Sequence, residues 1–191
     1  DSPEALTKAL ASTYLVDDRT ALLAYLALAL GRPLLCEGPA GVGKTELATA
    51  LATALARPLV RLQCYEGLDE GKALYEWDYG KQLLYTQLLR DTVAEKTRGA
   101  GGIDEAVERL VTEASVFYSD RFLVPRPLLA AVRSAEPVVL LVDEVDRADP
   151  EFEALLLEVL AEGQITVPEL GTFRAQHPPL VVLTTNGSRD M

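Results

Sequence analysis

The sequence predicts an α/β domain with a doubly wound parallel sheet, because short apolar runs alternate with helix-like segments. The runs at 33–37, 138–142 and 180–184 are rich in Leu and Val, which is typical of parallel strands buried on both faces. Helical patterns follow or precede each run, and this alternation favours a parallel sheet covered by helices. At 191 residues the chain is long enough for one domain with a sizeable core.

The first half of the chain supplies the elements around the first strand. A helix is expected over 18–30, ended by Gly31 and Pro33. Residues 44–56 place leucines on one helical face and predict a second helix. The following apolar run, 59–64, predicts another strand.

The middle stretch, 65–136, shows no strand signal of that quality, and we expect it to be helical in three or four pieces. Apolar residues keep helical spacing between 103 and 114, and a glycine-rich break lies at 99–102. Its tyrosines and tryptophan between 65 and 85 fit either local core or a partner-binding face.

After the strand at 138–142, the chain carries helix and turn signals. Asp149 is expected as the N-cap of a helix that begins at Pro150 and ends at Gly163. Residues 164–175 contain two short strand-like runs around a Pro-Glu-Leu-Gly turn, which predicts a hairpin before the last strand.

Charge and cysteine content exclude several classes of protein. The chain has 18 Lys and Arg against 29 Asp and Glu, a net charge of −11, so it lacks the basic surface of a nucleic-acid-coating protein. Cys36 and Cys64 lie in apolar surroundings, which favours a reducing, cytoplasmic compartment over a disulfide framework. The stretch 21–36 is interrupted by Gly, Arg and Pro, and no membrane span is expected.

Residues 38–45, GPAGVGKT, match the pattern G-x-x-x-x-G-K-[ST] without a mismatch, between a strand and a helix. Such a loop curls so that its backbone N–H groups face inward around an anion, at the positive end of the following helix. Glycines at 41 and 43 permit the backbone angles that this curl needs. In this pattern Lys44 reaches the β- and γ-phosphates and the Thr45 hydroxyl binds Mg²⁺.

The apolar run 138–142 delivers Asp143 and Glu144 to the carboxyl end of the sheet, where ligands bind in such folds. Asp143 is placed to support Mg²⁺, and Glu144 to polarise a water for attack on the γ-phosphate. The pair favours hydrolysis over transfer to a bound acceptor.

A polar tip, Thr184-Thr185-Asn186, ends the last strand. If the strands at 138–142 and 180–184 are neighbours, Asn186 lies beside Glu144 and can hydrogen-bond the attacking water or the γ-phosphate. The alternative is that Asn186 and Gly187 form a simple turn.

These three elements, in this order, resemble the Walker A, Walker B and sensor 1 motifs of the AAA+ ATPases, a family of P-loop NTPases. Finer features, in 37–48, 61–79, 121–132 and 143–172, are similar to the MoxR branch. Within that branch they are most similar to the carbon-monoxide-dehydrogenase-associated (CoxD-like) ATPases.

The resemblance implies a sheet ordered 5-1-4-3-2, with ATP or ADP and Mg²⁺ as cofactors. It implies catalytic roles for Lys44, Glu144 and Asn186, and metal binding by Thr45 and Asp143. Nucleotide binding is expected from Gly38, Pro39, Ala40, Gly41, Val42, Gly43, Lys44, Thr45 and Glu46.

Two further assignments come with the resemblance. Gln63, at the end of the second strand, is expected to hold Glu144 until a partner binds. Arg147 matches a basic position of the branch and is expected to face a neighbouring subunit, the alternative being an exposed arginine at a helix start. The segment 12–17 is expected to form the wall beside the adenine.

The family pattern also implies a homo-oligomer, a hexameric ring, that acts on a client protein. For the dehydrogenase-associated relatives the client is a metalloenzyme that receives its metal cofactor. Residues 1–191 are then one nucleotide-binding core with a helical insert at about 65–136 and a hairpin at about 164–175. The chain begins at Asp1 and ends at Met191, so we expect part of a longer protein, with the last core strand, the arginine finger and the helical lid beyond Met191.

Without an arginine finger, we expect nucleotide binding with slow hydrolysis. Three other functions stay open at this point. They are a P-loop kinase, a scaffold that binds nucleotide without turnover and, disfavoured by the acidic charge, a DNA-dependent motor.

Overall fold

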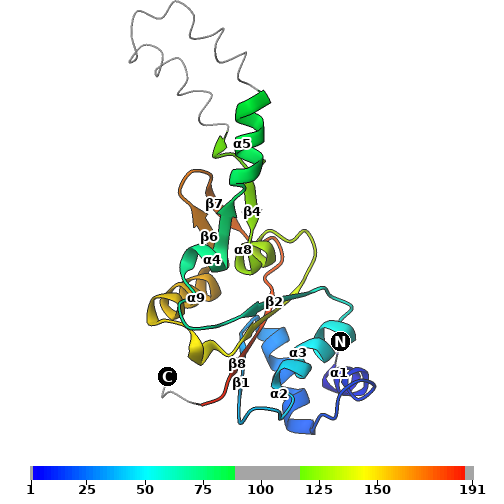
Figure 1. The fold of residues 1–191 in the computed structure, drawn as a ribbon. Coiled ribbons are helices and arrows are strands. Elements are labelled where there is room, and N and C mark those ends of the chain that lie inside the picture. Colours follow the sequence, from blue (N-terminus) through cyan, green and yellow to red (C-terminus); the bar gives the residue numbers. More distant parts are fainter. Residues whose placement is uncertain (1, 89–116, 188–191) are drawn as a thin grey trace, which may run out of the picture.

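The computed structural model describes residues 2–88 and 117–187, with a parallel four-stranded sheet at its centre (Figure 1). The strands, in spatial order, are β1 (Leu34–Glu37), β8 (Leu180–Thr185), β5 (Val139–Asp143) and β2 (Leu59–Gln63). Each predicted strand of this sheet is confirmed to within one residue at either end. In chain order these strands are the first, fourth, third and second, which agrees with the 1-4-3-2 part of the expected order.

Helices cover both faces of this sheet, so the doubly wound prediction is confirmed (Figure 1). One face is covered by α1 (Pro3–Leu10), α2 (Asp18–Leu30) and α3 (Lys44–Ala54). The other face is covered by α4 (Glu70–Leu74), α8 (Pro127–Val132) and α9 (Pro150–Glu162).

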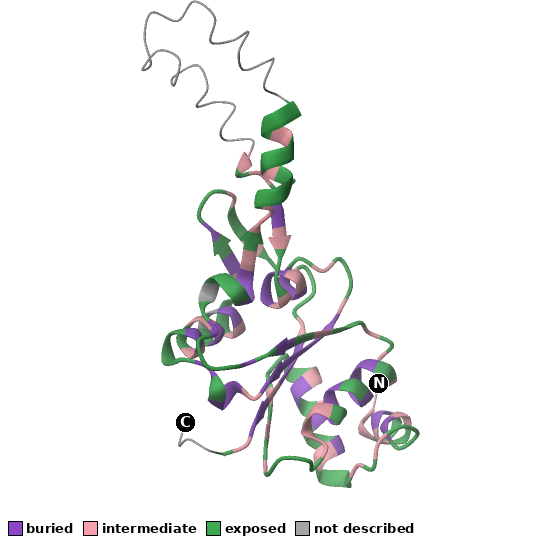
Figure 2. Ribbon diagram, viewed as in Figure 1, coloured by how far each residue is buried: buried purple, intermediate pink, exposed green. Residues whose placement is uncertain are grey.

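Strand β5 lies between the two hydrophobic cores. Its successive side chains point to opposite faces, as in any strand. Val139 and Leu141 pack with α1, α2 and α3, while Leu140 and Val142 pack with α4, α8 and α9. Every residue of β5 is buried, which Figure 2 shows as a continuous buried strand through the middle of the molecule.

Helix ends follow the predicted signals. Asp17 caps α2 by accepting a hydrogen bond from the Thr20 amide at 2.7 Å, and Gly31 ends the helix with a left-handed backbone. Gly163 ends α9 in the same way. Asp149 occupies the N-cap position of α9, as predicted, although its side chain makes no capping hydrogen bond.

The insert is not wholly helical, contrary to the sequence prediction. Strands β3 (Tyr75–Trp77) and β4 (Leu123–Pro125) pair in antiparallel fashion, next to α5 (Tyr79–Leu88). Each strand has three residues, too few to show an alternating pattern, and their partners are far apart in the chain. The predicted helix over 103–114 and the break at 99–102 lie outside the described residues.

Aromatic residues of the insert divide between core and surface. Trp77 packs edge-to-face against Tyr75 and Tyr118, with ring centroids 5.9 and 5.3 Å apart. Tyr79, by contrast, is 68% exposed at the start of α5, a helix without buried residues.

The predicted hairpin before the last strand is confirmed. Strands β6 (Gln164–Val167) and β7 (Gly171–Arg174) pair in antiparallel fashion as a separate two-stranded sheet. Ile165 and Val167 anchor it in the core beneath α8 and α9. No helix within the described residues combines the length and apolar character needed to cross a bilayer.

The burial pattern of α9 generates a stability prediction. Phe152 is 1% exposed in the core, and we expect Phe152→Ala to lower the free energy of unfolding by about 3–5 kcal/mol through lost burial and a cavity. Leu157, on the same helix, is 66% exposed, and Leu157→Ala should change the stability by less than about 0.5 kcal/mol. Urea unfolding measures both, and equal losses would contradict the placement of α9.

Candidate functional site

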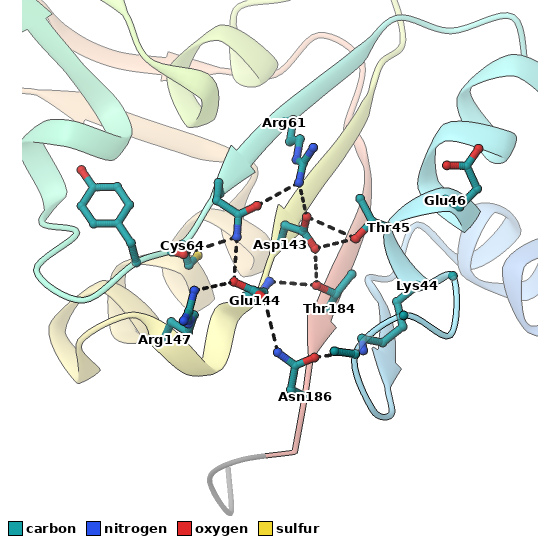
Figure 3. Close-up of a pocket in the computed structure, with 15 residues that line it drawn as sticks. Lys44, Thr45, Glu46, Arg61, Cys64, Asp143, Glu144, Arg147, Thr184 and Asn186 are labelled. Atoms are coloured by element: carbon teal, nitrogen blue, oxygen red, sulfur yellow. Dashed lines mark hydrogen bonds and ion pairs between the residues drawn. The ribbon is translucent and has the colours of Figure 1, made fainter.

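The candidate site lies at the carboxyl edge of the sheet, where the loop 38–43 joins β1 to α3. Asp143 ends β5 opposite Gln63 of β2, and β8 runs beside β5 on its other side. These elements enclose a cleft of about 580 Å³ (Figure 3). Its lining includes these residues of the predicted set: Ala40, Gly41, Gly43, Lys44, Thr45, Glu46, Gln63, Asp143, Glu144, Arg147 and Asn186.

Glycine is required in the loop for a physical reason. Gly41 and Gly43 have φ angles of 84° and 91°, in the left-handed region that side chains disfavour. A Cβ on Gly43 would also lie 3.3 Å from the Tyr14 hydroxyl, which donates a hydrogen bond to the Gly43 carbonyl at 3.3 Å. The segment 12–17 therefore supports the loop from outside.

Lys44 has its ammonium group folded back onto the loop. Its Nζ donates to the carbonyl oxygens of Gly38 and Pro39, at 2.6 and 2.8 Å, and to Asn186 Oδ1 at 3.1 Å. These three acceptors match the three donors of an ammonium group. Gly38 and Pro39 thus contribute carbonyls rather than cleft lining, and Val42 lines a second hollow beside Tyr14.

Asp143 is the most deeply buried acid of the site, at 4% exposure. Its Oδ1 accepts from the hydroxyls of Thr184, at 2.6 Å, and Thr45, at 2.9 Å. Its Oδ2 accepts from Arg61 Nη2 at 2.6 Å, an ion pair between β2 and β5. A buried carboxylate needs such partners, since burial without them is unfavourable.

Glu144 has a left-handed backbone, with φ 56° and ψ 51°, although it is not glycine. Such a conformation costs on the order of 1–3 kcal/mol and is held here by the Glu144 amide, which donates to Thr184 Oγ1 at 2.8 Å. The carboxylate accepts from Gln63 Nε2 at 3.0 Å, Arg147 Nη1 at 2.9 Å and Asn186 Nδ2 at 3.4 Å.

The structure therefore brings Lys44, Glu144 and Asn186 together, with Asn186 bridging the ammonium and the carboxylate (Figure 3). It places Arg147 on Glu144 of its own chain, as an ion pair across three residues. The side chain of Arg147 is 60% exposed, so this pair is accessible to solvent.

Two residues of the hydrogen-bond network, Arg61 and Thr184, were given no role in the sequence analysis. Gln63 was expected beside Glu144, and the structure places it on that carboxylate at 3.0 Å. Arg61 and Gln63 are two residues apart on β2 and point the same way, and Arg61 donates to Gln63 Oε1 at 2.9 Å. A charged residue in an otherwise apolar strand, two positions before Gln63, was the available signal. Thr184 precedes Thr185 and Asn186, and its role depends on the register between β5 and β8, which the sequence does not encode locally.

The site fits a magnesium nucleotide better than a bare metal. No cluster of three or more His, Cys, Asp or Glu side chains able to hold an ion occurs in the described part of the chain. Mg²⁺ typically takes one or two protein oxygens, with phosphates and waters completing its ligands. Thr45 and Asp143, in hydrogen-bond contact beside the phosphate loop, offer this set.

The cleft has a glycine loop between a strand and a helix on one side and the acidic end of β5 on the other. This combination defines the chain as a P-loop NTPase core. Comparison with known families agrees. The sequence profile of the AAA ATPase domain matches residues 17–182, and the chain belongs to that family.

Three individual proteins with similar sequences are two gas vesicle ATPases and a chaperone. The chain is 32% identical over 164 residues to the gas vesicle ATPases GvpN of Haloferax mediterranei and GvpN1 of Halobacterium salinarum, which covers 84% of this chain and 41% of either relative. It is 34% identical over 149 residues to chaperone protein ClpB 2 of Parasynechococcus marenigrum, covering 78% of this chain and 13% of that protein. The chain thus spans less than half the length of these relatives.

A solved structure shares the fold. A protein of Cytophaga hutchinsonii, described as a candidate ATPase, aligns with 98% of this chain and 44% of its own, at a TM-score of 0.58 and 18% identity. At that identity the match confirms the P-loop fold alone.

Cysteine reactivity tests the packing beneath the site. Burial, reinforced by the negative charge of nearby Asp143, raises the pKa of the Cys64 thiol to about 12. At pH 8 only about one thiol in ten thousand is then ionised, and the thiolate is the reactive form. In a Cys36→Ser variant, we expect Cys64 to react with a disulfide reagent about a thousandfold more slowly in the folded than in the urea-unfolded protein. Equal rates would contradict the burial of Cys64.

Proposed function

We propose that this chain binds ATP with Mg²⁺ and hydrolyses it. The convergence of Lys44, Thr45, Asp143 and Glu144 on one cleft carries the proposal, because it joins a phosphate-binding loop to a candidate general base. The family name and the names of the gas vesicle ATPases support the same activity. Residues 1–191 serve as one nucleotide-binding core in this proposal.

The loop holds the phosphates. Ala40, Gly41 and Gly43 of the loop and the first residues of α3 line the cleft, and the N-terminus of a helix favours anions. Lys44 exchanges its three present acceptors for phosphate oxygens, which form stronger, charge-assisted hydrogen bonds. Mg²⁺ supplies charge neutralisation of the phosphates when bound, and Thr45 with Asp143 would hold it.

Glu144 orients the attacking water as the general base. Its carboxylate accepts hydrogen bonds from Gln63, Arg147 and Asn186. A carboxylate with several donors is a poor base, so these contacts must loosen before catalysis. Gln63 is therefore a positioning residue that restrains Glu144, and Asn186 couples its release to the arrival of phosphate at Lys44.

For the assembled protein, we propose a MoxR-type homo-oligomeric ring, a hexamer, that remodels a client protein. The hairpin β6–β7 stands apart from the central sheet, as expected of a segment that contacts a client or the ring pore. The likeness to a chaperone, ClpB 2, supports protein remodelling. The resemblance of 61–79 and 143–172 to dehydrogenase-associated ATPases makes a metalloenzyme the proposed client.

Two other functions are weighed against this proposal. A P-loop kinase does not require a restrained general base beside Asn186, so this feature favours hydrolysis. A phosphorylated small-molecule product would support a kinase instead. A nucleotide-binding scaffold keeps the loop but does not need Glu144, and substitution of Glu144 distinguishes the two.

Lys44→Ala should weaken Mg·ATP binding at least tenfold, because charge-assisted hydrogen bonds to phosphate are lost. Isothermal titration calorimetry measures the affinity. Lys8, exposed on α1, provides the matched control, and Lys8→Ala should bind as the unaltered chain does. Equal binding by both variants would remove the phosphate loop from the proposal.

Glu144→Gln should lower the turnover number by about 10²-fold or more, the usual contribution of a general base, while Mg·ATP affinity changes less than about threefold. Release of inorganic phosphate under single-turnover conditions measures this loss even when hydrolysis is slow. Glu151→Gln, on the exposed first turn of α9, is the control. Unchanged turnover in Glu144→Gln would favour the scaffold.

A further inference from the structure

Arg61 brings a positive charge into the cleft at the place where the metal ligands lie. It extends from β2 and lines the cleft with Thr45 and Asp143. Its Nη2 donates to Asp143 Oδ2 at 2.6 Å and to Gln63 Oε1 at 2.9 Å. The side chain of Arg61 is 53% exposed and that of Asp143 is 5% exposed, so a partly exposed arginine pairs with a buried carboxylate.

The carboxylate that Arg61 contacts is also the proposed metal-supporting group. Asp143 already accepts from Thr184 and Thr45 on Oδ1, and Arg61 completes its partners on Oδ2. The guanidinium of Arg61 compensates the negative charge of Asp143. A cation placed at Thr45 and Asp143 meets repulsion from Arg61 at short range.

We propose that Arg61 is a positioning residue that sets the divalent-cation affinity of the site. It neutralises Asp143 when nucleotide is absent and opposes binding of a free divalent ion. Metal is then held firmly only when it arrives with phosphates, whose negative charge offsets the guanidinium. This inference rests on the proposed function, since the metal that Arg61 opposes is the one that accompanies the nucleotide.

Metal alone is the direct probe. Mn²⁺ substitutes for Mg²⁺, and the paramagnetic resonance signal of free Mn²⁺ falls as the ion binds. In nucleotide-free protein, Arg61→Gln should bind Mn²⁺ about tenfold more tightly than the unaltered chain, because an opposing charge is removed. Arg61→Lys keeps the charge and should stay within about threefold of the unaltered affinity.

Arg126 offers a matched control. It is 44% exposed and pairs with Glu76 at 2.6 Å, so it resembles Arg61 in exposure and geometry but does not line the cleft. Arg126→Gln should leave Mn²⁺ affinity unchanged. Unchanged Mn²⁺ affinity in Arg61→Gln would overturn the inference. An equal rise in Mn²⁺ affinity in both Arg61→Gln and Arg126→Gln would also overturn it, because it would show a general effect of net charge.

Urea midpoints establish that each variant is folded, and Arg61→Met, which keeps an unbranched stem on β2, replaces the Gln variant if that one unfolds. Calorimetry with Mg·ADP on the same samples separates this inference from the proposed function. Nucleotide binding with no effect of Arg61 on Mn²⁺ overturns the inference alone. The expected Mn²⁺ effect in a chain that binds no nucleotide overturns the proposed function and supports the electrostatic role of Arg61.

Discussion

The buried carboxyl group of Asp143 must find hydrogen-bond partners, and it finds them on three different elements. Thr45 comes from the start of α3, Arg61 from β2 and Thr184 from β8. Each partner can reach the carboxylate only if its strand or helix is correctly positioned along β5. The parallel register, which pairs Gln63 with Asp143 and Leu183 with Val142, sets the positions of β2 and β8 along β5. A polar group in the core thus fixes how loop, sheet and helix meet, and it does so where the phosphates would lie.

Hydrogen bonds join the candidate reactive groups to one another. Lys44 is held by two loop carbonyls and Asn186, and Asn186 in turn donates to Glu144. Glu144 also has a left-handed backbone, and its amide donates to Thr184 Oγ1, so both its side chain and its main chain are tied to neighbouring elements. Under the proposed function, this chain of contacts offers a route from the phosphate loop to the candidate base that needs no large movement of the sheet.

Much of this architecture could be predicted from local sequence. The loop 38–45 and the strand 138–142 carry signals that need no distant partner, and both lie as predicted. The strands β3 and β4 could not be found this way, because each has three residues and their pairing joins distant parts of the insert. Arg61 was missed for a related reason. The role of Arg61 depends on the register between β2 and β5, which places it near Asp143. Register between strands far apart in the chain is set by packing on both faces of the sheet. Asp149 takes the predicted N-cap position of α9, but the absence of a capping hydrogen bond from its side chain could be seen only in the structure.

Phosphate binding by loop 38–45 is tested directly by amide NMR spectra of isotopically labelled protein. On titration with Mg·ADP, we expect the largest shifts at Gly41, Gly43 and Lys44, whose N–H groups turn toward phosphate. Smaller shifts should follow at Glu144 and Asn186, through their contacts with each other and with Lys44. Saturable shifts confined to a distant element such as the hairpin β6–β7, with the loop unmoved at millimolar nucleotide, would contradict the account.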